Sequence, residues 1–465
     1  MNPDPISPVC PHPPAARRLA PPILLCLTFL LLTWPVILTG AQGTSEAYDQ
    51  RAFHEVVIRA MAGQWPNVDL VNYDSATTPG YHLVMAAAAA IISERTLVLQ
   101  LLSSLFGLAL LLAVYRTAAR LTGAWPAVAL TLPLLASSYF LGGSIWLTTD
   151  NAGKLFLVLA LGGSAMLAPS AARLARWGLY ATFAVLVRQI LLWVVAPIAL
   201  AALLASPMSR ILPPLFRLPR QPPHRWRDFL LPLPLVLAPF VVVAFFFYIW
   251  RGSVPPGYVS QHASGSNPAV IPLALALIGV YGIFFLPFFA GSDLKRILAD
   301  RLVWLAATSA LLLSLAFVTS FDKAAGRSGG TLWWLVGHLP TIAGRTILFP
   351  PLAVLGAIVT VCAWRAACAA GRSRAAAILL LSLLGWLLAQ LVNSKAWQRY
   401  CEPIVLIQFI WLAALAVPPS LRAATPALRR GWIGPLLLAL LLLAVSAYTL
   451  YYGAYLDLIH PAPEP

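Results

Sequence analysis

The stretch PGYHLVMAAAAAIIS (residues 79–93) decides the fold of this chain, because it sets the direction of every segment that follows it. It is apolar but only about fifteen residues long, and a tilted helix needs about 17 or more residues to cross a bilayer. If it crossed, Arg116 and Arg120 would face outward and every later loop would invert. If it does not cross, the later loops alternate correctly in charge. We therefore predict that residues 79–93 are re-entrant or lie at the membrane interface.

The composition of the whole chain indicates a lipid environment. Of its 465 residues, 60% are hydrophobic and 10% are charged, and the mean hydropathy is +0.82. A water-soluble domain usually carries about 25% charged residues, so this chain has too little polar surface for water. The composition predicts an all-α fold, a polytopic transmembrane helical bundle, in place of several soluble domains.

Apolar runs divide the chain into about thirteen transmembrane spans, of which the first is read as a retained helix and not as a signal peptide. The spans are expected at about 20–40, 96–115, 124–140, 151–168, 176–188, 190–205, 229–250, 269–290, 302–320, 347–364, 375–392, 402–417 and 432–452. A disordered cytoplasmic leader (1–18) precedes the transmembrane domain (19–453), and an outer tail (454–465) follows it. Inside the domain we expect a basic cytoplasmic loop at 206–228 and outer loops at 41–93 and 321–346.

Lysine and arginine residues orient the chain. The net charge is +16, but the basic residues fall in short clusters between apolar runs and not on one face, so we exclude a nucleic-acid partner. With residues 79–93 kept on one side, most of the 31 Lys and Arg residues lie in cytoplasmic loops, as the positive-inside rule requires. The N-terminus is therefore expected in the cytoplasm. Most of the acidic residues fall on the outer (periplasmic or lumenal) side, where we expect the chemistry.

The first outer loop carries a candidate general base. From Ser45 to Gly63, apolar residues recur at helical spacing, which predicts a helix lying flat on the membrane surface. Transfer of a group onto a hydroxyl acceptor needs a carboxylate to remove the proton, and Asp49 is the candidate. The alternative is that Asp49 is a first-turn acid favoured by the helix dipole.

Two further charged residues stand at helix ends. Asp150, in WLTTDNAGK (146–154), either caps the next helix, takes part in chemistry, or does both. Arg188 lies between two apolar stretches with almost no loop, at a depth where a guanidinium needs water, an acid or a phosphate. A structural salt bridge to Asp150 or Asp49 and the binding of a phosphate are both open. A guanidinium suits phosphate through paired hydrogen bonds.

The last outer turn, NSKAWQRYCEP (393–403), gathers Lys395, Trp397, Arg399 and Tyr400 in a short loop. Basic and aromatic residues are common anchors at the membrane interface, and they would equally serve a sugar or a lipid phosphate. In the outer loop 321–346, the segment GRSGG predicts mobility that could let the loop order over a substrate. The outer histidines share no metal-ligand spacing, so no metal site is expected.

Four short segments carry a resemblance to a known family. They are YDQRAFH (48–54), ATTPGYHL (76–83), LVRQILLW (186–193) and QRYCEPIVLI (398–407). In this order, across most of the chain, they resemble the dolichyl-phosphoglucose-dependent α-1,2-glucosyltransferases. The family pattern has an acidic pair before Phe-His, whereas here Gln50 and Arg51 replace that pair and Asp49 stands one residue earlier.

The resemblance implies a C-type (integral membrane) glycosyltransferase fold, with interfacial helices in the first outer loop. It implies a hexosyltransferase that takes a glucose-like sugar from a polyprenyl-phosphate donor, with membrane lipid and an acceptor glycan or lipid-linked saccharide as partners and no cofactor. In that reading Asp49 takes the acceptor proton, and Arg188 holds the departing phosphate with Arg399 or Lys395. The residues expected to bind or orient the acceptor are Asp150, His54 and Tyr400.

The competing function is a multi-pass transporter or flippase of lipid-linked or small-molecule substrates. Transporters place polar groups near the midplane, at broken helices, in paired halves of the chain. The expected spans hold few charges at mid-depth and show no internal repeat, which favours the enzyme.

Overall fold

The computed structural model describes residues 15–41, 44–206, 227–259, 265–290, 298–417 and 431–455. Most of the expected leader, of the basic loop 206–228 and of the outer tail lies outside these ranges. Within them the chain is nearly all helical, with one short antiparallel strand pair, β1 (Thr341–Ile342) and β2 (Arg345–Thr346).

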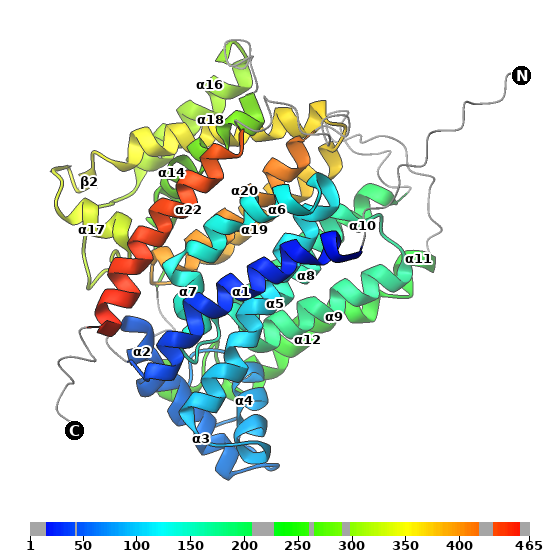
Figure 1. The fold of residues 1–465 in the computed structure, drawn as a ribbon, viewed down its shortest axis with the longest axis vertical. Helices are drawn as coiled ribbons and strands as arrows, with labels where there is room; N and C mark the ends of the chain where they lie inside the picture. The colour runs from blue at the N-terminus through cyan, green and yellow to red at the C-terminus, as the bar shows by residue number, and fades with distance from the viewer. Residues whose placement is uncertain are drawn as a thin grey trace, which may run out of the picture.

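The main helices follow one another from the N-terminus to the C-terminus (Figure 1). Their bounds are α1 (Ala15–Thr39), α2 (Ser45–Asp49), the π-helix η1 (Gln50–His54), α3 (Glu55–Gly63), α4 (Gly80–Ile91), α5 (Thr96–Thr122), α6 (Ala124–Ala136), α7 (Ser138–Ile145), α8 (Asp150–Met166), α9 (Ala171–Val187), the 3₁₀-helix η2 (Gln189–Val194), α10 (Val195–Ala205), α11 (Arg227–Leu230), α12 (Leu233–Trp250), the 3₁₀ turn η5 (Pro256–Tyr258), α14 (Val270–Ala290), α16 (Arg301–Ala316), α17 (Thr331–Gly337), α18 (Phe349–Ala369), α19 (Ser373–Leu391), α20 (Gln398–Ala416), α22 (Ile433–Ser446) and the π-helix η7 (Ala447–Tyr452).

Each expected span coincides with a helical segment. Eight of the described helices are long and apolar enough to cross a membrane: α1, α5, α12, α14, α18, α19, α20 and α22 with its continuation η7. The other expected spans are shorter. Helices α8 and α9 have 17 residues each, close to the lower limit of about 17 for a span. The chain is therefore a multi-pass integral membrane protein built as a helical bundle.

The expected span 124–140 is broken in the structure. Helices α6 and α7 meet at an angle of 72°, and the break falls at Ser137, whose backbone is extended. The Ser137 hydroxyl donates to the buried carboxylate of Glu402 at 2.6 Å, and its oxygen accepts from the Phe140 N–H at 3.4 Å. A buried polar group needs a hydrogen-bond partner, and the bend supplies one to Glu402. Sequence periodicity alone did not reveal this long-range contact.

Helix α4 is the structural form of the stretch 79–93. It has 12 residues, which at about 1.5 Å per residue is too short for the hydrocarbon core of a bilayer. Together with the continuous segment α2–η1–α3 it forms one end of the molecule, at the bottom of Figure 1. The expected helix in the first outer loop is thus present. Its position at the membrane surface stays a prediction.

Helix α20 lies at the centre of the bundle. Almost all of its side chains are buried, and it packs against α5, α6, α14 and α18. Beside it, α14 and α18 approach closely at two glycines: a Cβ on Gly279 would lie 2.2 Å from the Leu352 carbonyl oxygen, and one on Gly356 would lie 2.3 Å from that of Leu275. Small residues at such crossings let helix backbones touch. This core fixes the residues that α20 carries at its N-terminal end.

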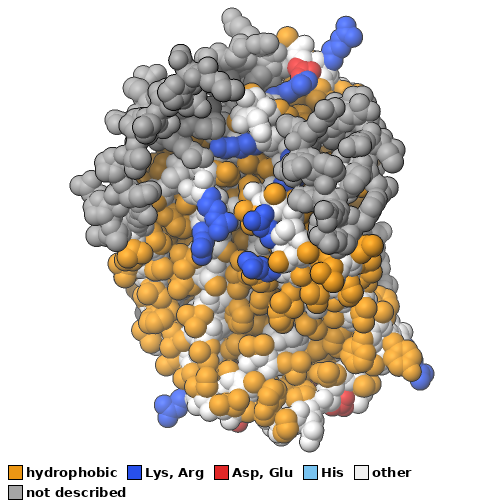
Figure 2. All heavy atoms as spheres, turned by 90° about the vertical axis from the view of Figure 1, so that its right-hand side faces the viewer, with side chains coloured by type: hydrophobic (Ala, Val, Ile, Leu, Met, Phe, Trp, Pro, Cys, Tyr) orange, Lys and Arg blue, Asp and Glu red, His pale blue; other side chains and the backbone are white. Residues whose placement is uncertain are grey.

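The outer surface agrees with a bilayer environment. Figure 2 shows a broad field of hydrophobic side chains, with a group of Lys and Arg side chains above it. Large apolar side chains such as Leu231, Tyr248 and Leu31 are more than two-thirds exposed (78%, 83% and 73%). In water a patch of this extent would be a liability, whereas in lipid it is the expected surface.

Candidate functional site

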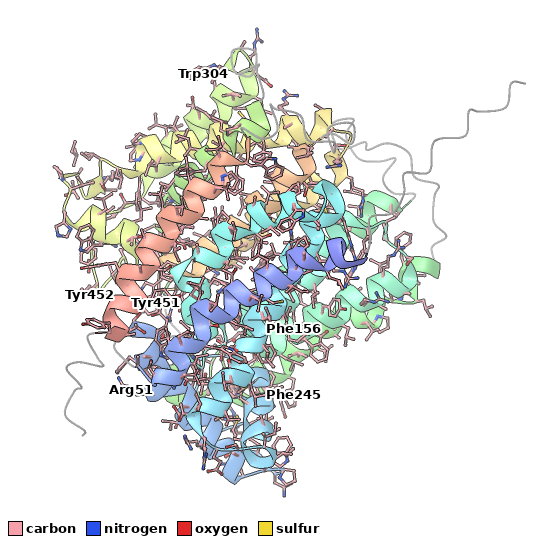
Figure 3. All side chains as sticks on the ribbon, viewed as in Figure 1. Arg51, Phe156, Phe245, Trp304, Tyr451 and Tyr452 are labelled. Atoms are coloured by element: carbon pink, nitrogen blue, oxygen red, sulfur yellow. The ribbon has the colours of Figure 1, made fainter. Side chains whose placement is uncertain are left out.

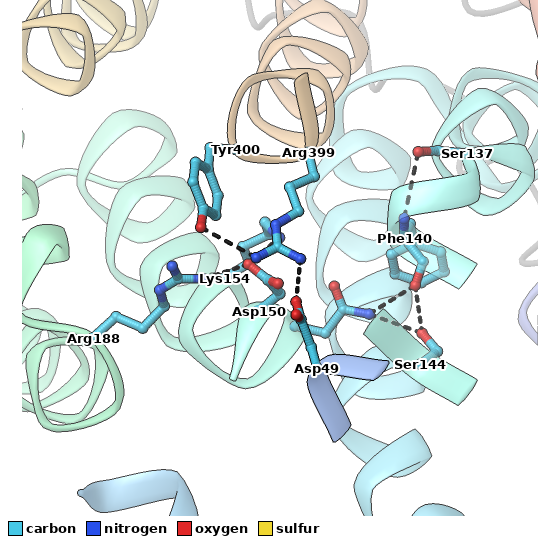
Figure 4. Close-up of polar contacts among 10 residues, drawn as sticks. Asp49, Ser137, Phe140, Ser144, Asp150, Lys154, Arg188, Arg399 and Tyr400 are labelled. Atoms are coloured by element: carbon cyan, nitrogen blue, oxygen red, sulfur yellow. Dashed lines mark hydrogen bonds and ion pairs between the residues drawn. The ribbon is translucent and has the colours of Figure 1, made fainter. Parts of the chain in front are cut away.

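Five charged side chains from four parts of the chain meet at one end of the bundle. Figure 4 shows Arg399 reaching from α20 to Asp49 on α2, with Asp150 and Lys154 of α8 beside them and Arg188 entering from the end of α9. We call these five residues the ion-pair cluster. Their side chains are between 7% and 22% exposed, so they form a half-buried and partly accessible site.

Asp49 forms an ion pair with Arg399, whose guanidinium donates to its carboxylate. Asp49 is the last residue of α2, and the acid in the first turn is Glu46. The alternative that Asp49 is an acid of the first helical turn is therefore wrong, because Asp49 ends α2. The helix continues after Asp49 as the π-helix η1, and single π turns often occur at functional sites.

Asp150 pairs with two cations. Its carboxylate accepts from the Arg188 guanidinium and lies 3.4 Å from the Lys154 ammonium nitrogen. Asp150 does begin α8, but no side-chain cap bond is formed at this helix start, where Thr149 is the N-cap residue. The carboxylate is thus used for ion pairing and not for capping. The salt bridge that the sequence left open for Arg188 is present.

The position of Arg188 is set by its neighbour in sequence. The Gln189 side chain donates to the carbonyl oxygens of Ala76 (2.8 Å) and Ser253 (3.2 Å) and accepts from the Thr78 N–H at 3.0 Å. The Thr78 hydroxyl donates to the Val185 carbonyl at 2.6 Å. The Thr-Thr-Pro and Arg-Gln segments are therefore one brace, which holds the first outer loop to the end of α9.

Two aromatic rings lie among the guanidiniums. The Tyr400 ring lies 5.2 Å from both the Arg188 and the Arg399 guanidinium carbon, and Trp397 lies 4.6 Å from that of Arg399. The Tyr400 hydroxyl accepts from Arg399 at 3.3 Å. Cation–π contacts of this kind contribute about 0.5–2 kcal/mol each. They keep two like charges close together.

A small, half-open pocket lies beside the ion-pair cluster. Three of its lining residues are charged, Asp150, Lys154 and Arg188, and the others are apolar or neutral. The remaining lining residues are Ile190, Leu191, Trp386, Gln390, Asn393, Tyr400 and Ile404. A lining of both charged and apolar side chains suits a ligand that has an anionic group and a hydrocarbon part.

Lys395 lies apart from this pocket. The Lys395 ammonium is 6.0 Å from the centre of the Trp397 ring, which also contacts the Arg399 guanidinium. Lys395 lines a second, open pocket together with Asn267 and Arg327. The structure therefore brings together Asp49, Arg188 and Arg399 as the sequence suggested, and it leaves Lys395 outside their cluster. The roles of all four residues stay predictions.

The GRSGG segment is packed against the loop 393–398. The Gly326 carbonyl accepts from Ala396 N–H and the Gly329 carbonyl from Gln398 N–H, both at 3.0 Å. The Trp333 indole donates to the Ala396 carbonyl at 2.6 Å. The mobile loop expected from the glycines is thus tied down in this structure. Gly326 and Gly329 have positive φ, so their glycine character is explained by the turn itself.

His54 takes part in a buried hydrogen-bonded chain. Its Nδ1 lies 2.9 Å from His82 Nε2, and His82 Nδ1 lies 2.6 Å from the Tyr73 hydroxyl. Burial lowers the pKa of His54 to about 4 and lowers that of His82 well below its usual value. Both imidazoles are therefore neutral near pH 7.

Gln50 and Arg51, which replace the acidic pair of the resembled family, have different surroundings. Gln50 is buried and donates to Glu55 at 3.1 Å, while its carbonyl accepts from Gln100 and from the Leu147 N–H. Arg51 is exposed at the outer edge of η1 (Figure 3). Gln50 therefore anchors the π-helix to the bundle, and neither residue joins the ion-pair cluster.

Three residues that the structure brings to the site had no role in the sequence-based prediction. Lys154 follows Asp150 by four positions, a spacing that pairs side chains on a helix, so a signal for it existed. His82 stands in the quoted segment ATTPGYHL, and its partner Tyr73 carried no signal. Among the described residues, no group of three or more His, Cys, Asp and Glu side chains is placed to hold a metal ion.

No protein-family model and no curated protein matches the chain. Among solved structures it is similar to ArnT from Cupriavidus metallidurans in the apo state, with 15% identity over 86% of this chain and 78% of that one and a TM-score of 0.36. It is similar to the same protein bound to undecaprenyl phosphate, with 15% identity over 85% of this chain and 77% of that one and a TM-score of 0.38. Because both TM-scores are low, this structural similarity carries no argument about function.

Proposed function

We propose that this chain is a membrane glycosyltransferase of the C-type fold, which moves a sugar from a polyprenyl-phosphate donor to a hydroxyl of an acceptor. The observation that carries the proposal is the ion-pair cluster beside a pocket lined by both charged and apolar side chains. Following the sequence resemblance, the sugar is a glucose-like hexose and the acceptor is a glycan or a lipid-linked saccharide. The reaction takes place on the outer face of the membrane.

The cationic residues suit a phosphate that gains charge during the reaction. The donor is a phosphodiester, and the departing polyprenyl phosphate gains negative charge as the bond to the sugar breaks. Arg188, Lys154 and Arg399 bind that product more strongly than the donor, which lowers the barrier. The buried Arg399 Nε has no hydrogen-bond partner among the described residues, so this donor remains for an oxygen of the ligand.

Asp49 suits the role of the base. In one displacement the acceptor oxygen bonds to the sugar's anomeric carbon, the bond from that carbon to the phosphate oxygen breaks, and the acceptor proton passes to the Asp49 carboxylate. A phosphate bound by Arg399 competes with Asp49 for the guanidinium and frees that carboxylate for the acceptor. Asp150 keeps Arg188 in place from the opposite side.

The apolar lining of the pocket suits the lipid part of the donor. Ile190, Leu191 and Ile404 line the same pocket as Arg188. A prenyl chain lying against these side chains keeps its hydrocarbon out of water at about 25 cal/mol per Å² of buried surface. The phosphate then reaches the guanidinium without leaving the membrane boundary.

The test is a transfer assay in membranes that contain the chain. A polyprenyl-phosphate donor with a radiolabelled glucose is supplied, and label is followed from the donor into a new product, with release of polyprenyl phosphate. We expect transfer by the wild-type chain and none above background in matched membranes that lack it. Movement of intact donor across the vesicle wall without release of polyprenyl phosphate would instead identify a flippase and overturn the proposal.

A further inference from the structure

Two hydrogen bonds join three side chains close to the ion-pair cluster. They run from His54, the last residue of η1, to His82 on α4 and on to Tyr73 in the loop between α3 and α4. The Tyr73 hydroxyl is in turn within hydrogen-bonding reach of Ser75 and Thr77. We call Tyr73, His82 and His54 the relay chain.

The chain is shielded from bulk water at its centre. His82 is 0% exposed and Tyr73 is 3% exposed, and His82 uses both of its ring nitrogens within the chain. His54 is under the electrostatic influence of Asp49, Asp150, Arg188 and Arg399. His82 is under that of His54, and Tyr73 under that of Tyr258. No carboxylate is hydrogen-bonded to either ring among the described residues. Two neutral imidazoles are thus hydrogen-bonded to each other inside the protein. Apolar side chains at these two positions would avoid the free-energy cost of burying polar groups.

The π-helix η1 brings the chain to the proposed base. Asp49 and His54 are five positions apart, which on an α-helix would turn their side chains about 140° away from each other. In a π-helix the backbone bonds join residues five apart, so positions 49 and 54 fall on the same side. His54 is only half-buried and feels the charge of Asp49.

The relay chain is held rigidly by its aromatic neighbours. Tyr73 is stacked on Trp250 of α12, with ring centres 6.4 Å apart, and the Trp250 indole donates to the Leu70 carbonyl at 2.8 Å. The two imidazoles are stacked with ring centres 5.1 Å apart. Packing that fixes donor and acceptor atoms at 2.6–2.9 Å is what a proton transfer between them requires.

We propose that the relay chain carries the acceptor proton from Asp49 away from the site, through His54 and His82 to Tyr73 and the hydroxyls of the 73–77 loop. This inference rests on the proposed function and assigns two further residues, His82 and Tyr73, to the same site. Asp49 must lose its proton after each transfer, and His54 is a neutral imidazole on the same side of the π-helix that can accept it.

The step balances with one proton in and one proton out. A proton from Asp49, passed directly or through one water, binds His54 Nε2, and the Nδ1 proton of His54 moves to His82 Nε2. The Nδ1 proton of His82 then moves to the Tyr73 oxygen, and the Tyr73 hydroxyl proton leaves to Ser75, Thr77 or water. Both imidazoles end neutral in the opposite tautomer. When both imidazoles return to their first tautomer, the hydrogen bonds of the relay chain regain their original direction.

The experiment compares Tyr73→Phe with Tyr81→Phe in the transfer assay. Tyr81 is a matched control, because it is also buried, precedes His82 on α4, and bonds through its hydroxyl to Ser103 at 2.8 Å, outside the relay chain. Turnover is measured in water and in deuterium oxide at saturating donor. We expect Tyr73→Phe to lower kcat about tenfold, a modest part of the usual 10²–10⁴-fold effect of acid–base groups. The KM for donor stays unchanged and the solvent isotope effect on kcat increases.

The outcomes separate the relay chain from the proposed function. Equal kcat and equal isotope effects in Tyr73→Phe and Tyr81→Phe, with active wild-type protein, would overturn the relay chain and leave the transferase standing. A second variant, His82→Asn, keeps a hydrogen bond but cannot pass a proton, and it must show the same rise in isotope effect. If the wild-type chain transfers no sugar, the proposed function falls, and the relay chain falls with it.

Discussion

Asp49 and Arg399 are 350 positions apart in the chain and form a direct ion pair. The carboxylate comes from the first outer loop and the guanidinium from the start of the central helix α20. Each charge therefore depends on the other for its partner in a half-buried site. Burial of one charge without its partner is costly, so this pair ties the geometry of the site to the packing of the whole bundle.

Replacement of Asp49 by Asn is expected to abolish transfer, with a loss of at least about 100-fold in kcat. The amide cannot accept the acceptor proton but keeps the shape of the side chain, so expression and thermal stability change little. The measurement is initial transfer rate at equal protein in membranes. The matched control is Glu94→Gln, which neutralises an exposed acid just after α4 and should keep wild-type rates. Normal turnover by Asp49→Asn would remove Asp49 as the base.

Arg188→Ala is expected to weaken donor use more than Arg188→Lys does. Lysine restores the charge beside Asp150 but not the paired hydrogen bonds of a guanidinium. We expect the KM for the polyprenyl-phosphate donor to rise about tenfold or more in the alanine variant and less in the lysine variant, in line with a charge-assisted bond of about 1.5–3 kcal/mol. Arg116→Ala, at an exposed position near the far end of α5, serves as the control. Unchanged donor dependence in both Arg188 variants would exclude Arg188 from the site.

Gln189→Leu is expected to destabilise the protein and to raise the KM for the donor. It removes one acceptor and two donor contacts, and so leaves the Thr78 N–H and the carbonyls of Ala76 and Ser253 without their partner. Unpaired groups of this kind cost about 1–3 kcal/mol. Thermal unfolding in detergent measures the first effect and donor titration the second. Gln64→Ala, which removes an exposed bond to the Asp69 N–H, should change neither quantity; an equal loss in both variants would contradict the brace.

Acidification is expected to destabilise the protein partly through His54. Burial lowers the folded-state pKa of His54 to about 4, against about 6.5 in the unfolded chain. Between these values the unfolded state binds the proton and the folded state does not, so stability falls as the pH is lowered from about 6.5 to about 4. The size of this contribution is up to about 3 kcal/mol.

The measurement is the unfolding midpoint at about pH 7 and about pH 5. Compared with wild type, His54→Gln should lose less stability between the two conditions, because the variant has no imidazole at position 54 to titrate. His338→Gln, in which an exposed histidine is replaced, should behave as wild type does. The same loss of stability in all three proteins would show that protonation of His54 does not destabilise the folded protein at low pH.

The helices were largely predictable, whereas the contacts between them were not. Apolar runs marked each span because bilayer thickness imposes a length on every crossing. The shortness of residues 79–93 likewise matched the 12 residues of α4. The break at Ser137 was not visible, because it depends on Glu402, which lies far along the chain.

The site was predictable only as separate charged residues. Asp49, Arg188 and Arg399 stood out because charges are expensive beside apolar runs. Asp150 was already one of two partners considered for Arg188. The pairing of Asp49 with Arg399 was not considered, since pairing over 350 positions has no sequence period. The π turn between Asp49 and His54 was equally hidden, because an apolar pattern of about 3.6 residues per turn does not distinguish one turn of a wider helix.

The wide separation of Asp49 and Arg399 also has a consequence for biosynthesis. A chain is made from its N-terminus at a limited rate, so Asp49 emerges from the ribosome long before Arg399 exists. Asp150 and Arg188, which are 38 positions apart, can meet much earlier. One half of the site can thus assemble while the ribosome is still translating, and the other half waits for almost the entire chain. A product truncated before α20 would insert into the membrane with half a site.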